Sequence, residues 1–199
     1  MPIYRTHTRF WTPDDADLAL AAILGLLASA AAQIRICAYG FTDPRITGAL
    51  VERHQAGVDT ALLLDYTQAC GPSEIAQVRR LKDAGVPFWV GTSEKAHAIR
   101  HSKNIIVDSE WAEIGSLNYS ATAFDQDNTV EIVRDKELAQ EALRLWNKSK
   151  QWILDNQSDK QTDYLVKHFA AAPVSVPSGL DLDPNRFPNP APDKAFPDF

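Results

Sequence analysis

The amino-acid sequence predicts an α/β fold in which helices flank a mixed β-sheet, followed by an extended Pro-rich C-terminal tail. Short apolar runs that match buried strands recur along the chain, and helical segments fall between several of them. Seven of the 12 prolines lie beyond residue 172. With 199 residues, of which 45% are hydrophobic, the chain can form one core of about 150 residues and an appendage.

The expected elements begin with a helix over residues 18–32. A helix start precedes it, with Pro13 and two aspartates near the positive end of the helix dipole, and an Ala/Leu-rich run follows. Further helices are expected near 44–56 and 73–84. Apolar runs predict strands at 34–39, 61–64, 86–90, 105–107, 112–114 and 130–133. This order favours a mixed sheet covered by helices.

The last element of the expected core is a long amphipathic helix over residues 136–154. Its apolar stripe is expected to contain Leu138, Ala142, Leu145, Trp146, Ser149, Trp152 and Ile153. Residues 157–172 are expected to continue as a short helix, and the Pro-rich segment after them has no core of its own. The chain therefore divides into a domain over 1–156 and a C-terminal extension over 157–199.

Two features of the sequence bear on the cellular compartment. Residues 18–32 end in small residues, as signal peptides do, but three aspartates immediately precede them, so we interpret the run as a core helix. The run is also shorter than the ~20 residues that span a membrane. Cys37 and Cys70 are too few for a disulfide framework or a zinc site. We expect a cytoplasmic protein without stable membrane insertion, and secretion without an N-terminal signal stays open.

Two short motifs of polar residues carry most of the functional information. His101, Lys103 and Asp108 have the spacing H-x-K-x(4)-D, and Ser116 and Asn118 follow within a G-S-x-N run. Positions i and i+2 of a strand point to the same face, so His101 and Lys103 project together, as do Ser116 and Asn118. The apolar residues after the first motif predict a strand that is buried on both faces. We expect the four polar groups to converge at a strand end.

These residue types suit the cleavage of a phosphodiester without a metal or another cofactor. The reaction needs a nucleophile, a proton donor for the leaving oxygen, and fixed donors for the phosphate oxygens. An imidazole suits either of the first two roles, because its unperturbed pKa is ~6.5.

The combined motif resembles the signature of the phospholipase D superfamily. Over about residues 10–154 the chain is similar to the small bacterial phospholipase-D-like endonucleases. The resemblance implies a phospholipase-D-like fold and a metal-independent reaction in which His101 forms a phosphohistidine. It also implies that Lys103 and Asn118 bind phosphate oxygens, and that Ser116 assists by hydrogen bonding.

Acidic residues near the motifs are further candidates. Asp108 lies at an odd offset from His101, so we interpret it as a structural turn or supporting residue. The small endonucleases carry an acidic residue, more often Glu, shortly after G-S-x-N. The resemblance puts Asp127 in this place, where it would orient His101; the alternative is a turn or cap acid. Asp65 is expected to cap a turn or helix, with a place in the cleft as the alternative.

The charge of the chain limits how it can hold nucleic acid. The net charge is −6, and residues 1–155 alone, with 16 basic and 20 acidic residues, carry −4. A broad basic surface for DNA or RNA is therefore absent from the composition. Lys95, His97 and Arg100, beside the motif, are candidate substrate-binding residues, although loop charges are often only solvated. Binding through such a local cluster is expected to be weak and salt-sensitive.

A single copy of the motif indicates a homodimer. The lipid-cleaving members that the motif resembles carry two copies in one chain, with one histidine from each. Here no second H-x-K occurs. The second histidine is expected from another subunit, with two copies of His101 facing each other across a twofold axis.

Two alternatives to a nuclease remain. A phospholipase or phosphatidyl transferase would share the catalytic residues and differ only in its substrate cleft, and the single motif argues against it. A catalytically silent dimeric scaffold could bind a partner protein through Phe187, Phe196 and Phe199 of the tail. The complete His-Lys-Ser-Asn set argues against the scaffold.

Overall fold

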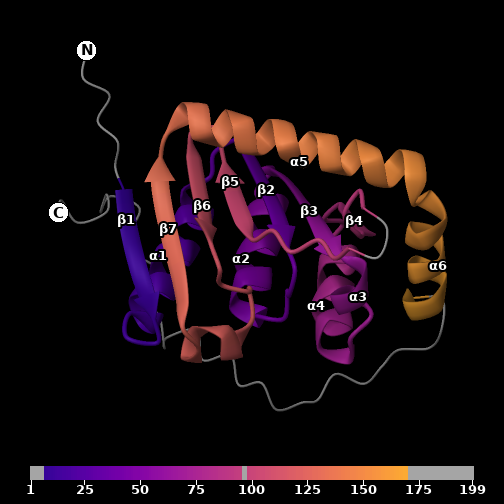
Figure 1. The fold of residues 1–199 in the computed structure, drawn as a ribbon, viewed down its shortest axis with the longest axis horizontal. Helices are drawn as coiled ribbons and strands as arrows, with labels where there is room; N and C mark the ends of the chain where they lie inside the picture. Colours follow the sequence, from indigo (N-terminus) through magenta and orange to yellow (C-terminus); the bar gives the residue numbers. More distant parts are fainter. Residues whose placement is uncertain (1–6, 96–97, 170–199) are drawn as a thin grey trace.

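A computed structural model describes residues 7–95 and 98–169. His97 and the Pro-rich tail with its three phenylalanines lie outside the described residues. Seven strands form one sheet, in the order β1-β7-β6-β5-β2-β3-β4 (Figure 1). The strands are β1 (His7–Thr12), β2 (Gln33–Ala38), β3 (Asp59–Asp65), β4 (Phe88–Gly91), β5 (Asn104–Val107), β6 (Trp111–Gly115) and β7 (Asn128–Arg134).

The helices are α1 (Ala16–Ser29), α2 (Pro44–Gln55), α3 (Tyr66–Ala69), α4 (Pro72–Asp83), α5 (Lys136–Asn156) and α6 (Ser158–Phe169), with a 3-10 turn, η1 (Ala121–Asp125). Strands β2, β3 and β4 run parallel, whereas β5, β6, β7 and β1 continue the sheet with antiparallel pairs. The predicted mixed sheet flanked by helices is confirmed.

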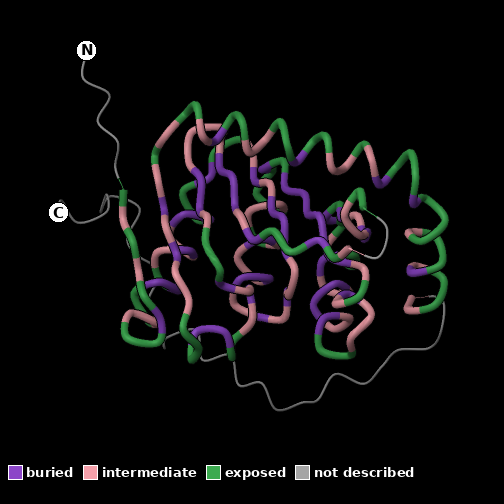
Figure 2. The backbone as a smooth tube through the Cα atoms, in the orientation of Figure 1, coloured by how far each residue is buried: buried purple, intermediate pink, exposed green. Residues whose placement is uncertain are grey.

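Alternating side chains of the central strands enter two separate cores. Ile105 and Val107 of β5 belong to the larger core, where the strands pack against α1, α2 and α4. Ile106, between them, belongs to a smaller core beneath α5, with Trp146 and Ile153. All three β5 side chains are at most 1% exposed, which confirms the prediction of a strand buried on both faces. Figure 2 shows that burial is concentrated in β5, β2 and β3, whereas much of α5 is exposed.

Local sequence signals explain where several helices begin and end. Asp43 caps α2 by accepting a hydrogen bond from the backbone of Arg45, with Pro44 at the first position. An Ala-Gly-Val sequence directly follows both α2 and α4. Its glycines, Gly57 and Gly85, adopt φ values of 93° and 79°. A side chain at either glycine would be strained, so these two residues end the helices.

Some expected boundaries and faces were wrong. Strand β1 was not expected; it pairs with β7 along its whole length, and its residues alternate in burial without an apolar run. The short elements α3 and η1 were not expected either. In α5 the buried residues are Ala139, Trp146 and Ile153, and Leu145 is 47% exposed instead of lying in the stripe.

Both ends of the described chain contribute to the core. The apolar run at 18–32 forms most of α1, whose Leu20, Ile23 and Leu26 are at most 2% exposed in the larger core, as the core-helix interpretation predicts. Helix α6 corresponds to the short helix expected after α5. Its Tyr164 is fully buried, and the hydroxyl donates to Ala69 O at 2.9 Å.

The strand directions bring both motifs to one edge of the sheet. The carboxyl ends of β2, β3 and β4 lie at this edge because the three strands are parallel. Strand β5 is antiparallel to β2, so it begins there, directly after Lys103. Strand β6 is antiparallel to β5 and therefore ends there, at Gly115. Ligand sites of open α/β sheets lie outside this edge.

Candidate active site

His101 and Lys103 lie in the segment that leads into β5. His101 is exposed, whereas Lys103 is only 6% exposed. Lys103 Nζ donates a hydrogen bond to the backbone oxygen of His101 at 2.7 Å, so the ammonium is fixed beside the imidazole-bearing residue. Burial lowers the pKa of Lys103. The segment therefore presents one exposed imidazole and one sheltered cation at the same strand end.

Tyr39, directly after β2, forms a wall beside both groups. The centroids of its ring and the His101 ring are 4.6 Å apart. Lys103 Nζ lies 5.0 Å from the centroid of the Tyr39 ring, within the range of a cation–π contact. Gln68 Nε2 donates to the Tyr39 hydroxyl at 3.0 Å and orients the ring. This aromatic wall was not among the predicted site residues.

Asn118 lies at the same edge, and the oxygen of its side-chain amide has no hydrogen-bond partner among the described residues. Its Oδ1 is buried without a hydrogen-bond partner, and no described residue bonds to its side chain. A Cβ at Gly40 would lie 3.5 Å from Asn118 Cγ, so the loop after β2 passes close to this amide. Tyr119 N donates to Gly40 O at 3.0 Å, which ties the two loops together. The Asn118 side chain is thus held in place; its orphaned Oδ1 is an acceptor, and Nδ2 is the only donor of the same amide.

Ser116 is linked to β7 rather than to His101 or Lys103. Its hydroxyl donates to Asn128 Oδ1 at 2.9 Å and accepts from Thr129 N at 3.1 Å. Gly115 makes this link feasible, because a Cβ there would lie 2.0 Å from Thr129 O. The hydroxyl is at the exposed edge of the sheet, and its bonds fix the start of the G-S-x-N loop.

Two buried acidic side chains hold the loops around the site. Asp65 caps α3 through Thr67 N, and its Oδ2 accepts from Arg100 N at 2.6 Å. Glu74, in the first turn of α4, accepts from Phe41 N at 2.9 Å. The first bond fixes the residue before His101, and the second fixes the loop that begins with Tyr39. The expected cap role of Asp65 is confirmed, and its second bond ties it to the site.

A third buried acid supports the loop after Asn118. Glu113 of β6 is fully buried and accepts a hydrogen bond of 2.6 Å from the Tyr119 hydroxyl. Burial raises the pKa of Glu113 to about 8, and burial likewise raises that of Glu74 to about 8. Both carboxyls are therefore neutral near pH 7, which avoids two uncompensated charges in the core.

The segment that carries His101 is also held at its beginning. Gln157, at the end of α5, accepts from Thr92 N at 2.8 Å and donates to Thr92 Oγ1 at 2.6 Å. Arg100 Nη2 donates to Thr92 O at 2.9 Å, so a hydrogen bond joins the residue before His101 to the residue after β4. Its conformation thus depends on residues from β3, β4 and the α5–α6 junction.

The remaining predicted site residues lie in different places. Asp108 lies at the opposite end of β5, where its carboxylate accepts from the backbone of Ala31, Ala32 and Gln33 at 2.7–2.8 Å. It holds the turn between α1 and β2, which is the structural role that its offset suggests. Asp127 is exposed, and no described residue bonds to its side chain, so an orienting bond to His101 is not formed here.

Two further observations concern ligands and membranes. Within residues 7–95 and 98–169, no three His, Cys, Asp or Glu side chains gather in a way that could hold a metal ion. No helix in the same ranges is long and apolar enough to cross a bilayer.

The family of the chain follows from a comparison with known domains. A family model described as cardiolipin synthase, PLD-like domain, matches residues 23–149, which is more than half of the chain. The chain belongs to this PLD-like family. The phospholipase D superfamily that the two motifs indicated is thereby confirmed. The matched region runs from α1 to α5 and contains all the residues of the edge described above.

Curated relatives of this PLD-like domain carry lipid-related names. The phospholipase D of Rickettsia felis is 34% identical over 111 residues, which are 55% of this chain and 52% of that protein. The mitochondrial cardiolipin hydrolase of Xenopus laevis is 26% identical over 65% of this chain and 62% of that protein. The chain thus spans about half the length of the Rickettsia relatives that it matches.

Solved structures confirm the phospholipase-D-like fold. Nuc of Salmonella typhimurium, a phospholipase D family member, is 30% identical, with a TM-score of 0.67 over 74% of this chain and 95% of that one. NucT of Helicobacter pylori has a TM-score of 0.69 over 74% of this chain and 96% of that one, at 21% identity. The second likeness concerns the fold alone.

Proposed function

We propose that this PLD-like protein is a homodimeric phosphodiesterase that cleaves DNA or RNA through His101, without requiring a metal ion. The observation that carries the proposal is the grouping of an exposed imidazole, the Lys103 ammonium and the Asn118 amide, whose Nδ2 is a donor, at one strand end. A cation and an amide donor can neutralise and orient a phosphate beside a nucleophile. The similarity to Nuc over 95% of that chain supports this assignment.

The proposed reaction has two displacements at phosphorus. Neutral His101 of one subunit attacks, a P–N bond forms, and the P–O bond to the leaving group breaks. The partner subunit's His101, in its protonated form, gives its proton to the leaving oxygen. Water then attacks the phosphohistidine and loses a proton to the now neutral second imidazole, while the P–N bond breaks. Because one imidazole must be neutral and the other protonated, a bell-shaped pH–rate profile is expected.

The dimer supplies the second histidine. Each chain has a single H-x-K pair, so a monomer offers one imidazole where the reaction uses two. His101 is exposed at the edge of the sheet and is therefore accessible to a second copy. A twofold axis close to this edge would bring two imidazoles to one phosphate.

The test is hydrolysis of single-stranded DNA, plasmid DNA and RNA by the full chain in excess EDTA. Wild type is expected to cleave at least one of them, and His101→Ala is expected to lose the activity. His7→Ala is the matched control, because His7 lies on β1 opposite Val133, at the other end of the sheet. Cleavage that needs an added metal ion, or full activity in His101→Ala, would refute the mechanism.

A second candidate function is a phospholipase, which the names of the Rickettsia and Xenopus relatives favour. The same residues would act on a phosphatidyl phosphodiester. Hydrolysis of phosphatidylcholine or cardiolipin vesicles by wild type, with no action on nucleic acids, would replace the nuclease by this function. Absence of hydrolysis of both substrate classes would favour a non-catalytic scaffold.

A further inference from the structure

A cavity of ≈ 330 Å³ adjoins His101 on the side of α5. Residues 93–95 and 99–102 line it, together with Ser149 of α5. His101 belongs to its wall, so the cavity opens next to the proposed nucleophile. Three serine hydroxyls in the wall, those of Ser93, Ser102 and Ser149, can donate hydrogen bonds to an anion.

Arg100 places an uncompensated cation in this wall. The residue is 6% exposed, Nη2 donates to Thr92 O, and Nε is buried without a partner. No described carboxylate forms an ion pair with the guanidinium, since Asp65 uses its carboxylate on the backbone of Arg100 and on Thr67. Cys37 contacts the guanidinium, but burial raises the pKa of its thiol, so it adds no negative charge. A buried, unpaired guanidinium is costly and suits an anionic ligand.

The other charges around the cavity also favour an anion. Lys95 is an exposed cation in the wall. Glu94 is the only acidic residue of the described lining, and Lys148 Nζ pairs with it at 3.2 Å. The cavity therefore has a local positive charge in a chain whose net charge is −6.

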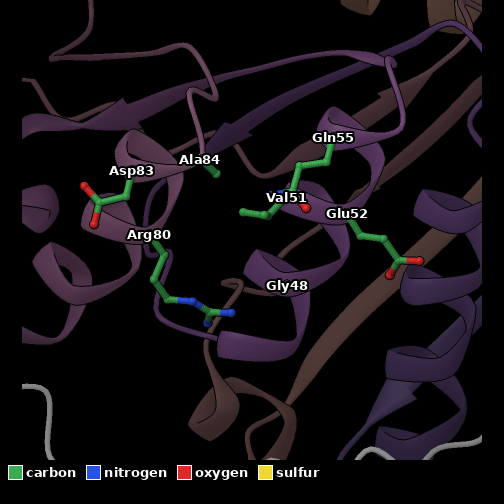
Figure 3. A pocket seen from close by; sticks show the side chains of 7 residues that line it. All are labelled: Gly48, Val51, Glu52, Gln55, Arg80, Asp83 and Ala84. Atoms are coloured by element: carbon green, nitrogen blue, oxygen red, sulfur yellow. The ribbon is translucent and has the colours of Figure 1, made fainter.

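A second cavity, of ≈ 440 Å³ between α2 and α4, provides the contrast. Figure 3 shows Arg80 reaching from α4 toward the helix that carries Gly48, with Asp83 and Glu52 on either side. Arg80 Nη1 already donates to Pro44 O and to a side-chain oxygen. Two acids and one partnered arginine give this cavity no attraction for an anion.

We propose that the cavity beside His101 binds the phosphate that neighbours the scissile one, so that the preferred substrate is a polynucleotide. The inference rests on the proposed function and extends it by naming a second phosphate contact. Protein contacts to backbone phosphates come mainly from Arg, Lys and hydroxyl side chains, the groups present here. The lining carries three hydroxyls and two cations beside a single large apolar side chain, Ile99, and this arrangement favours a nucleic-acid strand over a lipid.

Short substrates with one or two phosphodiesters test this subsite in the full-length protein. The dinucleotide TpT has one phosphodiester, and the trinucleotide TpTpT has two. A third substrate is a trinucleotide in which one linkage is a neutral methylphosphonate and the other is a normal phosphodiester. We expect kcat/KM for TpTpT to exceed that for the other two by about tenfold, the effect of one charge-assisted contact.

Two variants assign the effect to the cavity. Lys95→Ala is expected to reduce the ratio of the trinucleotide to the dinucleotide kcat/KM several-fold. Lys136→Ala, on α5 and outside the cavity, removes the same charge and is expected to leave the ratio unchanged.

The outcomes separate this inference from the proposed function. Equal kcat/KM values for all three substrates would overturn the subsite and leave the nuclease intact. Cleavage of long DNA or RNA with no cleavage of these three would overturn the subsite alone, and cleavage of neither long nor short nucleic acids would overturn both. Hydrolysis of cardiolipin, which has two phosphodiesters, in preference to phosphatidylglycerol and with no trinucleotide cleavage would replace the polynucleotide by a lipid.

Discussion

At the scale of single residues, Tyr39 links the two ionisable groups of the motif. Its ring contacts the His101 imidazole and the Lys103 ammonium, and Gln68 fixes its hydroxyl. A cation over an aromatic face is stabilised by ~0.5–2 kcal/mol. Tyr39 is therefore a positioning residue that orients both groups without reacting itself.

We expect Tyr39→Leu to lower kcat about tenfold with little change in KM, because a loss of ~1.4 kcal/mol in the transition state is tenfold in rate. Tyr39→Phe keeps the ring, loses only the bond from Gln68, and is expected to retain most of the activity. Steady-state kinetics and thermal unfolding of both variants provide the measurement. Equal losses in the two variants would assign the effect to the hydroxyl and contradict the role of the ring.

Among the described glycines, Gly115 leaves the least room for a side chain, because β7 lies directly against its backbone. Because a Cβ would lie 2.0 Å from Thr129 O, Gly115→Ala must push the strands apart and displace Ser116. We expect the free energy of unfolding to fall by ~1–3 kcal/mol, measured by urea denaturation. The control Gly25→Ala, in α1 with no atom within 4 Å, is expected to raise it by ~0.5–1 kcal/mol. A Gly115→Ala protein as stable as wild type would disprove the close contact.

At the scale of elements, β6 and α4 each carry one carboxyl into the interior near the site. Burial raises the pKa of Glu113 and of Glu74 to about 8, whereas an unfolded Glu titrates near ~4.3. Between these values the folded protein holds two protons that the unfolded chain has released. The free energy of unfolding therefore falls as the pH rises from about 4.3 to about 8.

Glu113→Gln keeps an acceptor for the Tyr119 hydroxyl and removes one of these titrations. We expect the decline in unfolding free energy between pH 5 and pH 8 to become shallower by about 1.4 kcal/mol per pH unit. Denaturation curves at several pH values measure it. In the control Glu141→Gln the slope should stay as in wild type, because Arg144 lowers the pKa of Glu141 and its titration lies below this window. A parallel pH dependence of wild type and Glu113→Gln would contradict a buried neutral acid.

The sequence predicted elements that contain a continuous apolar run or a helical period of apolar residues, and missed those stabilised by tertiary contacts alone. Strand β5 was predicted from its run of three apolar residues, all of which are buried in the structure. Strand β1 was not, since this edge strand has only two adjacent aromatic residues among polar ones and no longer apolar run; only pairing with β7 defines it. Leu145 was placed on the wrong face of α5 because α5 contacts the sheet through a narrow stripe around Trp146.

The sequence likewise predicted only some of the residues of the candidate site. The residues of the two motifs are close in sequence, so spacing alone could group His101, Lys103 and Asn118. Tyr39 and Glu74 come from loops and helices far along the chain, and no local pattern connects them to the motifs. Their roles follow from hydrogen bonds and ring contacts that form only when β2, β3 and β5 meet at one edge.

At the scale of the whole molecule, the acidic net charge restricts substrate binding to the neighbourhood of the site. The cations that face it, Lys95, Arg100 and Lys103, are few, so few counterions are released when a phosphate backbone binds. A protein of this kind is expected to act without tight binding. Its turnover then depends on how the two histidines are assembled.

The proposed composite site predicts how wild type and His101→Ala behave in mixtures. If one site uses an imidazole from each subunit, a mixed dimer is inactive. After the two are unfolded and refolded together with a ninefold excess of the variant, activity per wild-type chain should fall about tenfold, because most wild-type chains then have a variant partner. The same proteins combined without refolding provide the control and should keep their activity while subunits do not exchange. Unchanged activity after joint refolding would mean that one chain carries a complete site, and the proton donor would then have to come from the same subunit as the nucleophile.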